Sequence, residues 1–359
     1  MLVVFRVDAS GVIGTGHVMR CLTLADSLRS RGGQCVFVTR EHDGHLGGLI
    51  RGRGFEAIVL PLEPAIAPTT GGYGHWLGGG WEADADATLA AFAGRRPDWV
   101  IVDHYAIDER WERRVKPHCH RLAVIDDLAD RDHDCDLLLD QNAVAGAEER
   151  YAGRVPGSCH LMLGPRYALL QPKYAELHAN ARTRGTEIRR VLVYFGGVDA
   201  KDITGLAVDA LLALDRPDIA VDVVVEPTHP RARSLAERVA GHANFTVHGR
   251  LPTLAPLMLA ADLAIGAGGA TTWERCCLGL PTLVITIADN QTAAAAELHR
   301  QGLIRWLGRH SDANSEALRE ELKRLLGEGI ADTWSKKCSE LVDGRGASRV
   351  VDELWRKIK

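Results

Sequence analysis

Short apolar runs alternate along the whole chain with longer segments whose apolar residues recur at the spacing of one helix face. Continuous apolar runs of this length are typical of strands buried on both faces, so the alternation predicts parallel sheets covered by helices. The pattern occurs twice, and a stretch at 164–189 that carries Gly-Pro, Gln-Pro and then a polar run separates the two halves. Because 359 residues exceed what one core usually organises, we expect two α/β domains.

The predicted elements can be assigned by residue range. The helix after the first strand is the clearest, because its apolar residues from Val18 to Leu28 follow a 3.6-residue period and Gly32 and Gly33 end it. The first half carries predicted strands at 2–7, 35–39, 57–60, 99–103, 122–125 and 136–139. The second half carries strands at 190–195, 220–225, 245–248, 262–265 and 282–287, and helices at 203–214, 231–240, 254–260, 271–279 and 291–301.

This organisation predicts two Rossmann-like, doubly wound parallel-sheet domains that face a cleft. We place the N-terminal domain at 1–170, a linker at 171–189 and the C-terminal domain at 190–345. An amphipathic helix at 346–359 is expected to pack back on either domain. In such sheets ligands bind beyond the carboxyl ends of the strands, so the loops at those ends are the places to look for chemistry.

Composition excludes several classes of protein. Hydrophobic residues make up 46% and charged residues 25%, as in globular chains, and a net charge of -4 makes nucleic acid an unexpected partner. The eight cysteines are scattered without a CxxC pair and are expected as free thiols of a cytoplasmic protein. The N-terminus reads as a strand and not a signal peptide, and no apolar run is long enough to span a membrane. The oligomeric state stays open.

The first candidate site is Gly14-Thr15-Gly16-His17, between the first strand and the first helix. Glycines let the backbone approach a ligand, and the start of a helix offers free N–H groups. The segment lacks the third glycine of a dinucleotide fingerprint and the GK[ST] ending of a P-loop. A histidine at this position is a candidate general base, and a structural or helix-capping role is the alternative.

Two further segments carry polar groups after strands of the second half. Gly266 to Glu274 offers backbone N–H groups, two hydroxyls and a helix start, which suit a diphosphate, and Glu274 could accept hydrogen bonds from a ribose. The segment Asp289-Asn290-Gln291 could hold sugar hydroxyl or acetamido groups. The alternative for each is an ordinary helix cap.

The remaining candidates are weaker. Asp103-His104-Tyr105 and Phe195-Gly196-Gly197 follow strands and would line the cleft, with a helix cap and a turn as the alternatives. The segments 118–120 and 133–135 contain metal-ligating residue types, but neighbouring side chains in a strand alternate faces, and no second pair stands at zinc-type spacing. Asp126-Asp127 is a single acidic pair, so we expect no metal. The glycine-rich loop 71–80 is interpreted as a surface excursion.

Taken together, these residues resemble one family, the UDP-sugar hydrolases of the pseudaminic acid pathway, which are relatives of the glycosyltransferases of the GT-B fold. No one motif is specific, but their order and spacing over both halves are. The motifs are Gly14-Thr15-Gly16-His17 with Arg20-Cys21, Val102-Asp103-His104-Tyr105, Ile125-Asp126-Asp127-Leu128, Leu163-Gly164-Pro165-Arg166-Tyr167, Phe195-Gly196-Gly197-Val198-Asp199, Gly266 to Glu274, and Gly279-Leu280-Pro281 leading to Asn290-Gln291.

The resemblance implies a GT-B-like enzyme that hydrolyses UDP-2,4-diacetamido-2,4,6-trideoxy-β-L-altropyranose to UDP and the free sugar, with inversion and without a metal or cofactor. It gives His17 the role of base on the attacking water. It implies substrate contacts for Asp8, Gly14, Gly16, Arg20, Asp103, Tyr105, Asn290 and Gln291, and UDP contacts for Gly196, Gly197, Gly249, Leu251, Gly268, Gly269, Thr271, Thr272 and Glu274. The chain departs from the family at Glu226, where glycine is expected, and in the loop 71–80, which could contact the sugar.

Several functions fit the same chemistry. UDP is a good leaving group, so one base suffices where ordinary glycosidases need two carboxylates. The alternatives are a UDP-sugar-dependent GT-B glycosyltransferase, a hydrolase of a differently configured UDP-diacetamido sugar, a UDP-N-acetylglucosamine epimerase and a non-catalytic nucleotide-sugar binding protein. In every case the expected ligand is a small-molecule nucleotide sugar.

Overall fold

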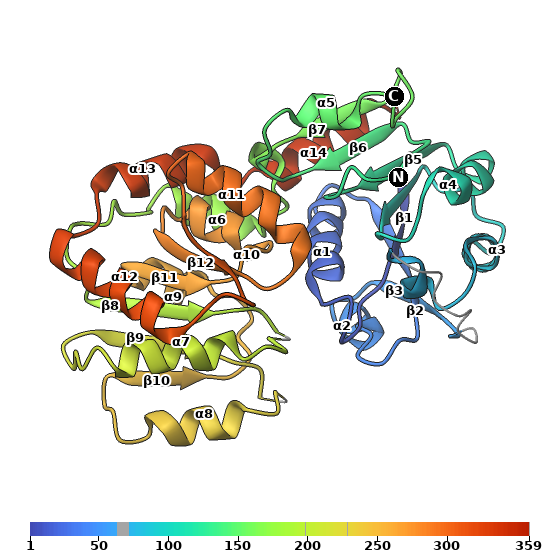
Figure 1. Cartoon of the computed structure of the whole chain (residues 1–359). Coiled ribbons are helices and arrows are strands. Elements are labelled where there is room, and N and C mark those ends of the chain that lie inside the picture. Colours follow the sequence, from blue (N-terminus) through green and yellow to red (C-terminus); the bar gives the residue numbers. More distant parts are fainter. Residues whose placement is uncertain (63–71, 198, 228, 359) are drawn as a thin grey trace. The chain divides into compact units, whose positions relative to one another are not determined.

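The computed structural model describes residues 1–62, 72–197, 199–227 and 229–358 (Figure 1). The chain forms two compact units, Met1–Gln171 together with Arg345–Lys359, and Pro172–Gly344. Each unit is built on one sheet whose strands all run parallel. The prediction of two Rossmann-like α/β domains is therefore confirmed.

The sheet of the first unit has seven strands in the order β3-β2-β1-β4-β5-β6-β7. The direction of winding reverses between β1 and β4, which is where ligands bind in open sheets of this kind. The strands are β1 (Leu2–Val7), β2 (Gln34–Arg40), β3 (Glu56–Leu60), β4 (Trp99–Asp103), β5 (Arg121–Ile125), β6 (Leu137–Asp140) and β7 (His160–Leu163). The helices are α1 (Gly16–Arg29), α2 (Gly47–Gly52), α3 (Trp81–Ala91), α4 (Glu109–Val115), α5 (Ala147–Tyr151) and α14 (Gly346–Arg356), with 3₁₀ turns η1 (Gly74–Leu77), η2 (Lys116–His118) and η3 (Pro165–Tyr167).

The sheet of the second unit has six strands in the order β10-β9-β8-β11-β12-β13. The strands are β8 (Arg190–Tyr194), β9 (Ala220–Val224), β10 (Phe245–His248), β11 (Leu263–Gly266), β12 (Thr282–Thr286) and β13 (Arg305–Arg309). The helices are α6 (Pro172–His178), α7 (Ile203–Leu212), α8 (Ala232–Val239), α9 (Ala255–Ala260), α10 (Thr271–Cys277), α11 (Thr292–Arg300), α12 (Ser315–Glu328) and α13 (Asp332–Leu341), with the 3₁₀ turn η4 (Asp289–Gln291). Among the helices in the described part of the chain, none is long and apolar enough to cross a membrane.

The strand predictions fail only at the edges of the sheets. All eleven predicted strands are present, within a residue or two of their predicted bounds, but β7 and β13 are missed. Both are edge strands, and β13 has the sequence RWLGR, with a charged residue at each end. An edge strand faces solvent along one side and tolerates polar residues, so its sequence lacks the continuous apolar run that marks a central strand.

The segment expected to be a linker is structured from its first residues. Pro172–His178 forms α6, and the side chain of Arg184 is completely buried. The Arg184 guanidinium donates to the backbone oxygens of Met258 at 2.7 Å, of Ala261 at 3.3 Å, and of Leu278. The polar run is therefore held in the second unit by the hydrogen bonds of one buried arginine. Its polar composition had indicated an exposed linker.

The amphipathic tail helix packs on the first unit. Val350, Val351 and Leu354 of α14 belong to the same buried cluster as Val18 and Leu22 of α1. The indole N–H of Trp99 on β4 also donates to the backbone oxygen of Leu354 at 3.1 Å. The last helix thus completes one face of the sheet that the first strand begins.

A buried ion network lies beneath the opposite face of this sheet. Asp84 of α3 accepts hydrogen bonds from Arg6 at 2.6 and 3.0 Å, from Arg40 at 2.6 Å and from the indole of Trp111 at 3.0 Å. All four side chains are at most 1% exposed. Burial alone raises the pKa of the Asp84 carboxyl, but the two guanidinium groups hold it below its usual value.

We expect Asp84→Ala to lower the free energy of unfolding by about 3–5 kcal/mol, because two buried guanidinium groups lose their common partner. Asp86→Ala on the same helix is the matched control. Asp86 is 55% exposed and pairs with Arg114 at the surface, so its loss should cost less than about 1 kcal/mol. Urea unfolding of the two variants measures the difference, and equal losses would contradict this account of the network.

Candidate active site

His17 lies where β1 and β4 end side by side in the first unit. The two strands pair in parallel with Val7 opposite Asp103, and His17 follows β1 as the second residue of α1. Its Nδ1 lies 2.6 Å from Oδ1 of Asp103, the last residue of β4, whose side chain is fully buried. Two residues that are 86 positions apart in sequence are therefore held in one hydrogen bond by adjacent strand ends.

This contact assigns the tautomer of His17. Burial raises the pKa of the Asp103 carboxyl, but Arg20 and His17 lower it much further, so the group is an anion. An ionised carboxylate only accepts hydrogen bonds, so Nδ1 of His17 carries a proton, and whenever the ring is neutral its lone pair is on Nε2. Nε2 has no hydrogen-bond partner among the residues that the structure describes. This is the arrangement of a general base oriented by a buried carboxylate.

Arg20 fixes the other side of Asp103. Its Nε and one terminal nitrogen donate to the two carboxylate oxygens at 2.6 and 2.7 Å. The same guanidinium reaches Asp127 after β5 at 2.8 and 3.0 Å, and Asp127 also accepts from the hydroxyl of Tyr105 at 2.7 Å and from Asn142 at 2.8 Å. Arg20 and Tyr105, which the sequence placed on the substrate side, are therefore joined by Asp127. Sequence reasoning missed Asn142, since a lone asparagine after a predicted strand carries no motif.

Aromatic rings surround the imidazole of His17. The ring of Tyr105 lies edge-on to it, with centroids 4.6 Å apart, and Trp76 stacks on Tyr105 at 5.5 Å with an angle of 23°. Tyr73 contacts both rings, with centroids 4.7 Å from Trp76 and 5.1 Å from Tyr105.

These rings change the interpretation of the glycine-rich loop. Trp76 and Tyr73 come from the segment interpreted as a surface excursion, and Gly71 at its start lies outside the described residues. Trp76 is only 9% exposed and its ring centroid lies 6.3 Å from that of His17, so this part of the loop packs on the site. The sequence hid this because glycines dominate the segment and mask its aromatic residues.

Asp8 and the two loop glycines occupy different surroundings. Asp8 is fully buried. Its Oδ1 lies 2.7 Å from Arg6 and accepts the backbone N–H of Arg40 at 2.7 Å. Its Oδ2 lies 3.2 Å from His104. Its carboxylate is thus engaged by protein groups. Gly14 has φ +81°, and no atom lies within 4 Å of a Cβ built on Gly14 or on Gly16, so open space borders the backbone of this loop.

In the second unit, Gln291 joins two of the segments that the sequence treated separately. Its side-chain oxygen accepts the backbone N–H groups of Gly268 at 3.3 Å and of Ile287 at 3.0 Å. A Cβ on Gly268 would lie 3.3 Å from both Gln291 and Thr286, so glycine permits this close approach. The loop after β11 and the turn η4 after β12 therefore form one structure, and Asn290 is exposed within it.

Beneath that loop lies Arg275, which sequence reasoning missed. Its guanidinium donates to the hydroxyl of Thr272 at 3.0 Å and to the backbone oxygen of Ala267 at 2.5 Å. A Cβ on Gly266 would overlap the Arg275 side chain and the backbone oxygen of Tyr194, so glycine is required there. Burial lowers the pKa of Arg275 to about 10. Thr272 is thus turned inward, whereas Thr271 is partly exposed at the first position of α10.

Glu274 sits one turn into α10 with a perturbed carboxyl group. Burial raises its pKa to about 7, although the Tyr174 hydroxyl and Arg275 lower it in part. The group is therefore balanced between its neutral and charged forms near neutral pH, which is common at functional sites.

The other candidates of this unit lie at the same ends of neighbouring strands. Gly196, with φ +96°, and Gly197 follow β8, and Gly249 and Leu251 follow β10. Val198 lies outside the described residues, while Asp199 accepts the N–H groups of Ile203 and Thr204 in the first turn of α7, at 3.0 and 2.9 Å. Because β8, β10, β11 and β12 run parallel, all these candidates gather along one edge of the sheet. Glu226, the departure from the family, lies beside this edge, 3.7 Å from a Cβ built on Gly197.

The metal-like segments have other partners. His133 Nδ1 lies 2.6 Å from Oε1 of Glu112, with both side chains fully buried. Across the described ranges, no group of three His, Cys, Asp or Glu side chains is placed to hold a metal ion. All eight cysteines are free, and seven of them are buried.

Solved structures establish the class of fold. MurG of Acinetobacter baumannii superposes with a TM-score of 0.68 at 15% identity and covers 99% of both chains. UGT71G1 of Medicago truncatula, solved with UDP-glucose, gives a TM-score of 0.65 at 12% identity over 98% of both chains. The protein therefore has a GT-B-like α/β fold, as the sequence predicted.

Sequence comparisons narrow the relationship. Residues 207–343, within the second unit, match the glycosyltransferase family 28 C-terminal domain. The chain is 24% identical over 84% of its length to the UDP-2,4-diacetamido-2,4,6-trideoxy-β-L-altropyranose hydrolase of Campylobacter jejuni and covers 97% of that protein. The resemblance drawn from the motifs is thereby confirmed.

Two other relatives are matched over only part of their length. An uncharacterised protein of Methanocaldococcus jannaschii is 25% identical over 79% of this chain, and the spore coat polysaccharide biosynthesis protein SpsG of Bacillus subtilis is 30% identical over 55% of it. The chain spans 55% and 58% of these relatives, respectively.

The tautomer of His17 can be tested directly. We expect ¹⁵N NMR of the imidazole to show a protonated Nδ1 and a lone pair on Nε2, and Asp103→Asn to shift the ring toward the opposite tautomer, because an amide can donate to Nδ1. Asp127→Asn is the matched control, since Asp127 contacts Arg20 and not His17, and should leave the tautomer unchanged. A wild-type ring protonated on Nε2 would contradict the assignment.

Proposed function

We propose that this protein hydrolyses UDP-2,4-diacetamido-2,4,6-trideoxy-β-L-altropyranose to UDP and the free 2,4-diacetamido sugar, with inversion, in the pseudaminic acid pathway of the cytoplasm. One observation carries the proposal: His17 is oriented through Nδ1 by the buried anion Asp103, and its Nε2 has no hydrogen-bond partner among the described residues. The similarity to the Campylobacter jejuni hydrolase along most of both chains supports the choice of substrate.

The proposed reaction needs one base and no metal. Nε2 of His17 takes a proton from water, the water oxygen forms a bond to the anomeric carbon, and the bond from that carbon to the UDP oxygen breaks with both electrons leaving on UDP. The imidazolium that forms is stabilised by Asp103, which stays ionised because Arg20 holds it. Attack from the face opposite UDP inverts the anomeric centre.

The second unit supplies the proposed UDP site. Glu274 would accept hydrogen bonds from the ribose, the loop 268–272 would hold the diphosphate, and the turn at 249–251 would contact the uracil through its backbone. The support for this is local, since these groups lie along one edge of a parallel sheet and Gln291 fixes the glycine loop against the next turn. Such loops bind phosphates through backbone N–H groups.

A glycosyltransferase is the second candidate. The match of residues 207–343 to the glycosyltransferase family 28 C-terminal domain favours it, because transfer uses the same UDP-sugar and replaces water with an acceptor hydroxyl. A panel of UDP-sugars followed by proton NMR separates the two. Free sugar of inverted anomeric configuration, formed from the diacetamido substrate without any acceptor, is the expected result. Turnover that depends on an acceptor would replace the hydrolase with a transferase, and an epimerised UDP-sugar would make the enzyme an epimerase.

The role of His17 has its own test. His17→Ala should lower turnover by about 10²–10⁴-fold, the usual contribution of a general base, with little change in UDP affinity. His75→Ala is the control, because His75 is an exposed histidine beside the same aromatic cluster and should retain turnover. Unchanged turnover in His17→Ala would remove this histidine from the mechanism.

Glu274 should make UDP binding depend on pH. The pKa of its carboxyl is about 7 in the free protein, so the group is half protonated near neutral pH. Hydrogen bonds from a ribose diol would favour its charged form. Binding would then release a proton, so UDP affinity should rise from about pH 6 to about pH 8. Calorimetry of Glu274→Gln beside the wild type isolates this effect, because the ionisation of UDP itself is common to both. Parallel pH profiles for the two proteins would count against a ribose contact.

A further inference from the structure

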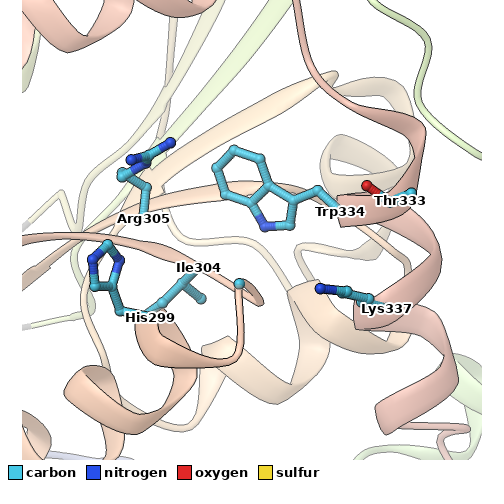
Figure 2. A pocket seen from close by; sticks show the side chains of 7 residues that line it. His299, Ile304, Arg305, Thr333, Trp334 and Lys337 are labelled. Atoms are coloured by element: carbon cyan, nitrogen blue, oxygen red, sulfur yellow. The ribbon is translucent and has the colours of Figure 1, made fainter.

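A pocket of about 250 Å³ lies at the outer edge of the second unit's sheet, between α11, β13 and α13 (Figure 2). Its walls are formed by His299, Gly302, Ile304, Arg305, Thr333, Trp334 and Lys337. The volume is close to that of eight liquid waters, at about 30 Å³ each, so the pocket suits a molecule of roughly ten heavy atoms.

Donor groups line this pocket from three elements, with Lys337 and Arg305 on opposite sides of the Trp334 ring (Figure 2). The Lys337 ammonium contacts only the backbone oxygen of Gln301, at 3.5 Å, and has no ion-pair partner among the described residues. The Arg305 guanidinium lies 3.2 Å from Glu321 through Nε and is 40% exposed. His299 accepts the backbone N–H of Trp306 on Nδ1 at 3.3 Å, so in the neutral ring the proton sits on Nε2.

Carboxylates are missing from the described lining of the pocket. Its polar side chains are His299, Arg305, Thr333 and Lys337, all of which can donate hydrogen bonds. Glu321 offsets part of the charge of Arg305 but leaves that of Lys337 uncompensated. The positive potential of the pocket therefore favours an anion.

A planar apolar surface forms the rest of the wall. The indole N–H of Trp334 donates to the backbone oxygen of Leu303 at 2.7 Å, which fixes the ring. Ile304 adds aliphatic surface, and Gly302, with φ +71°, keeps the space beside Lys337 open, since a Cβ there would lie 3.5 Å from Nζ. A fixed aromatic ring beside a cation is a combination that recognises a flat molecule carrying an acid group.

The pocket is separate from the proposed nucleotide site. β13 runs parallel to β12, with Arg305 opposite Leu283 near the beginning of both strands. The loops assigned to UDP follow the carboxyl ends of the strands. They therefore lie at the opposite ends of the strands from Arg305.

We infer that this pocket is a second binding site, for a small monoanion or dianion, either carboxylate or phosphate, attached to a planar ring. Lys337 would bind the acid group in the space beside Gly302, and the ring would lie against Trp334.

Phenyl phosphate is the probe, titrated calorimetrically into the full chain kept saturated with UDP. We expect a Kd of about 0.1–1 mM, as for other ligands of this size. Lys337→Met should weaken binding by about ten- to a hundredfold, because a charge-assisted hydrogen bond is lost. Lys336→Met is the matched control, since Lys336 is an exposed neighbour on the same helix that does not line the pocket.

Benzyl alcohol and inorganic phosphate are titrated in the same way to separate binding of the ring from binding of the acid group. Each should bind more weakly than phenyl phosphate. Equal affinity of Lys337→Met and wild type would overturn the site. Benzyl alcohol binding as tightly as phenyl phosphate would overturn its preference for anions. Phenyl phosphate binding that is seen in the UDP-free chain but not in the UDP-saturated chain would show that the probe occupies the nucleotide site instead, which would overturn this inference and leave the proposed hydrolysis untouched.

Discussion

The carboxylate of Asp103 is the constraint on which the chemistry proposed for the first unit depends. It is buried at the end of a central strand, and burial by itself would favour its neutral form. Arg20 reverses that preference with two charge-assisted hydrogen bonds, and the resulting anion orients His17. Arg20 and His17 are three residues apart on α1, so one face of one helix carries both the proposed base and the cation that stabilises its partner.

This arrangement favours the interpretation of His17 as a base over that of a helix cap. The glycines leave open space beside the backbone, while the aromatic residues Tyr105 and Trp76 cover the flank of the imidazole. The two rings thereby cover one flank of the imidazole, while Asp103 and Arg20 hold its Nδ1 side. The base is thus positioned by packing as well as by hydrogen bonding.

Much of the fold followed from periodicity, because central strands such as β4 and β12 are uninterrupted apolar runs. The principal loops also followed, since glycines and polar residues stand directly after those runs. Three features were not accessible from the sequence. Asn142 and Arg275 act through contacts that depend on which strands are neighbours, and Arg184 anchors a segment that is polar in composition. The aromatic side of the site was hidden for a related reason, since the rings that pack against Trp76, such as Tyr105 and His104, come from another part of the chain.

The return of α14 to the first unit makes the second unit an insertion in sequence, bounded by Gln171 and Arg345. Val350 and Leu354 fill the same apolar cluster as residues of β1 and α1. During synthesis, the hydrophobic layer over that face of the sheet therefore stays incomplete until more than three hundred residues have followed the first strand. The second unit contains all of its own strands and helices within one continuous segment, so its core does not depend on residues that come after it.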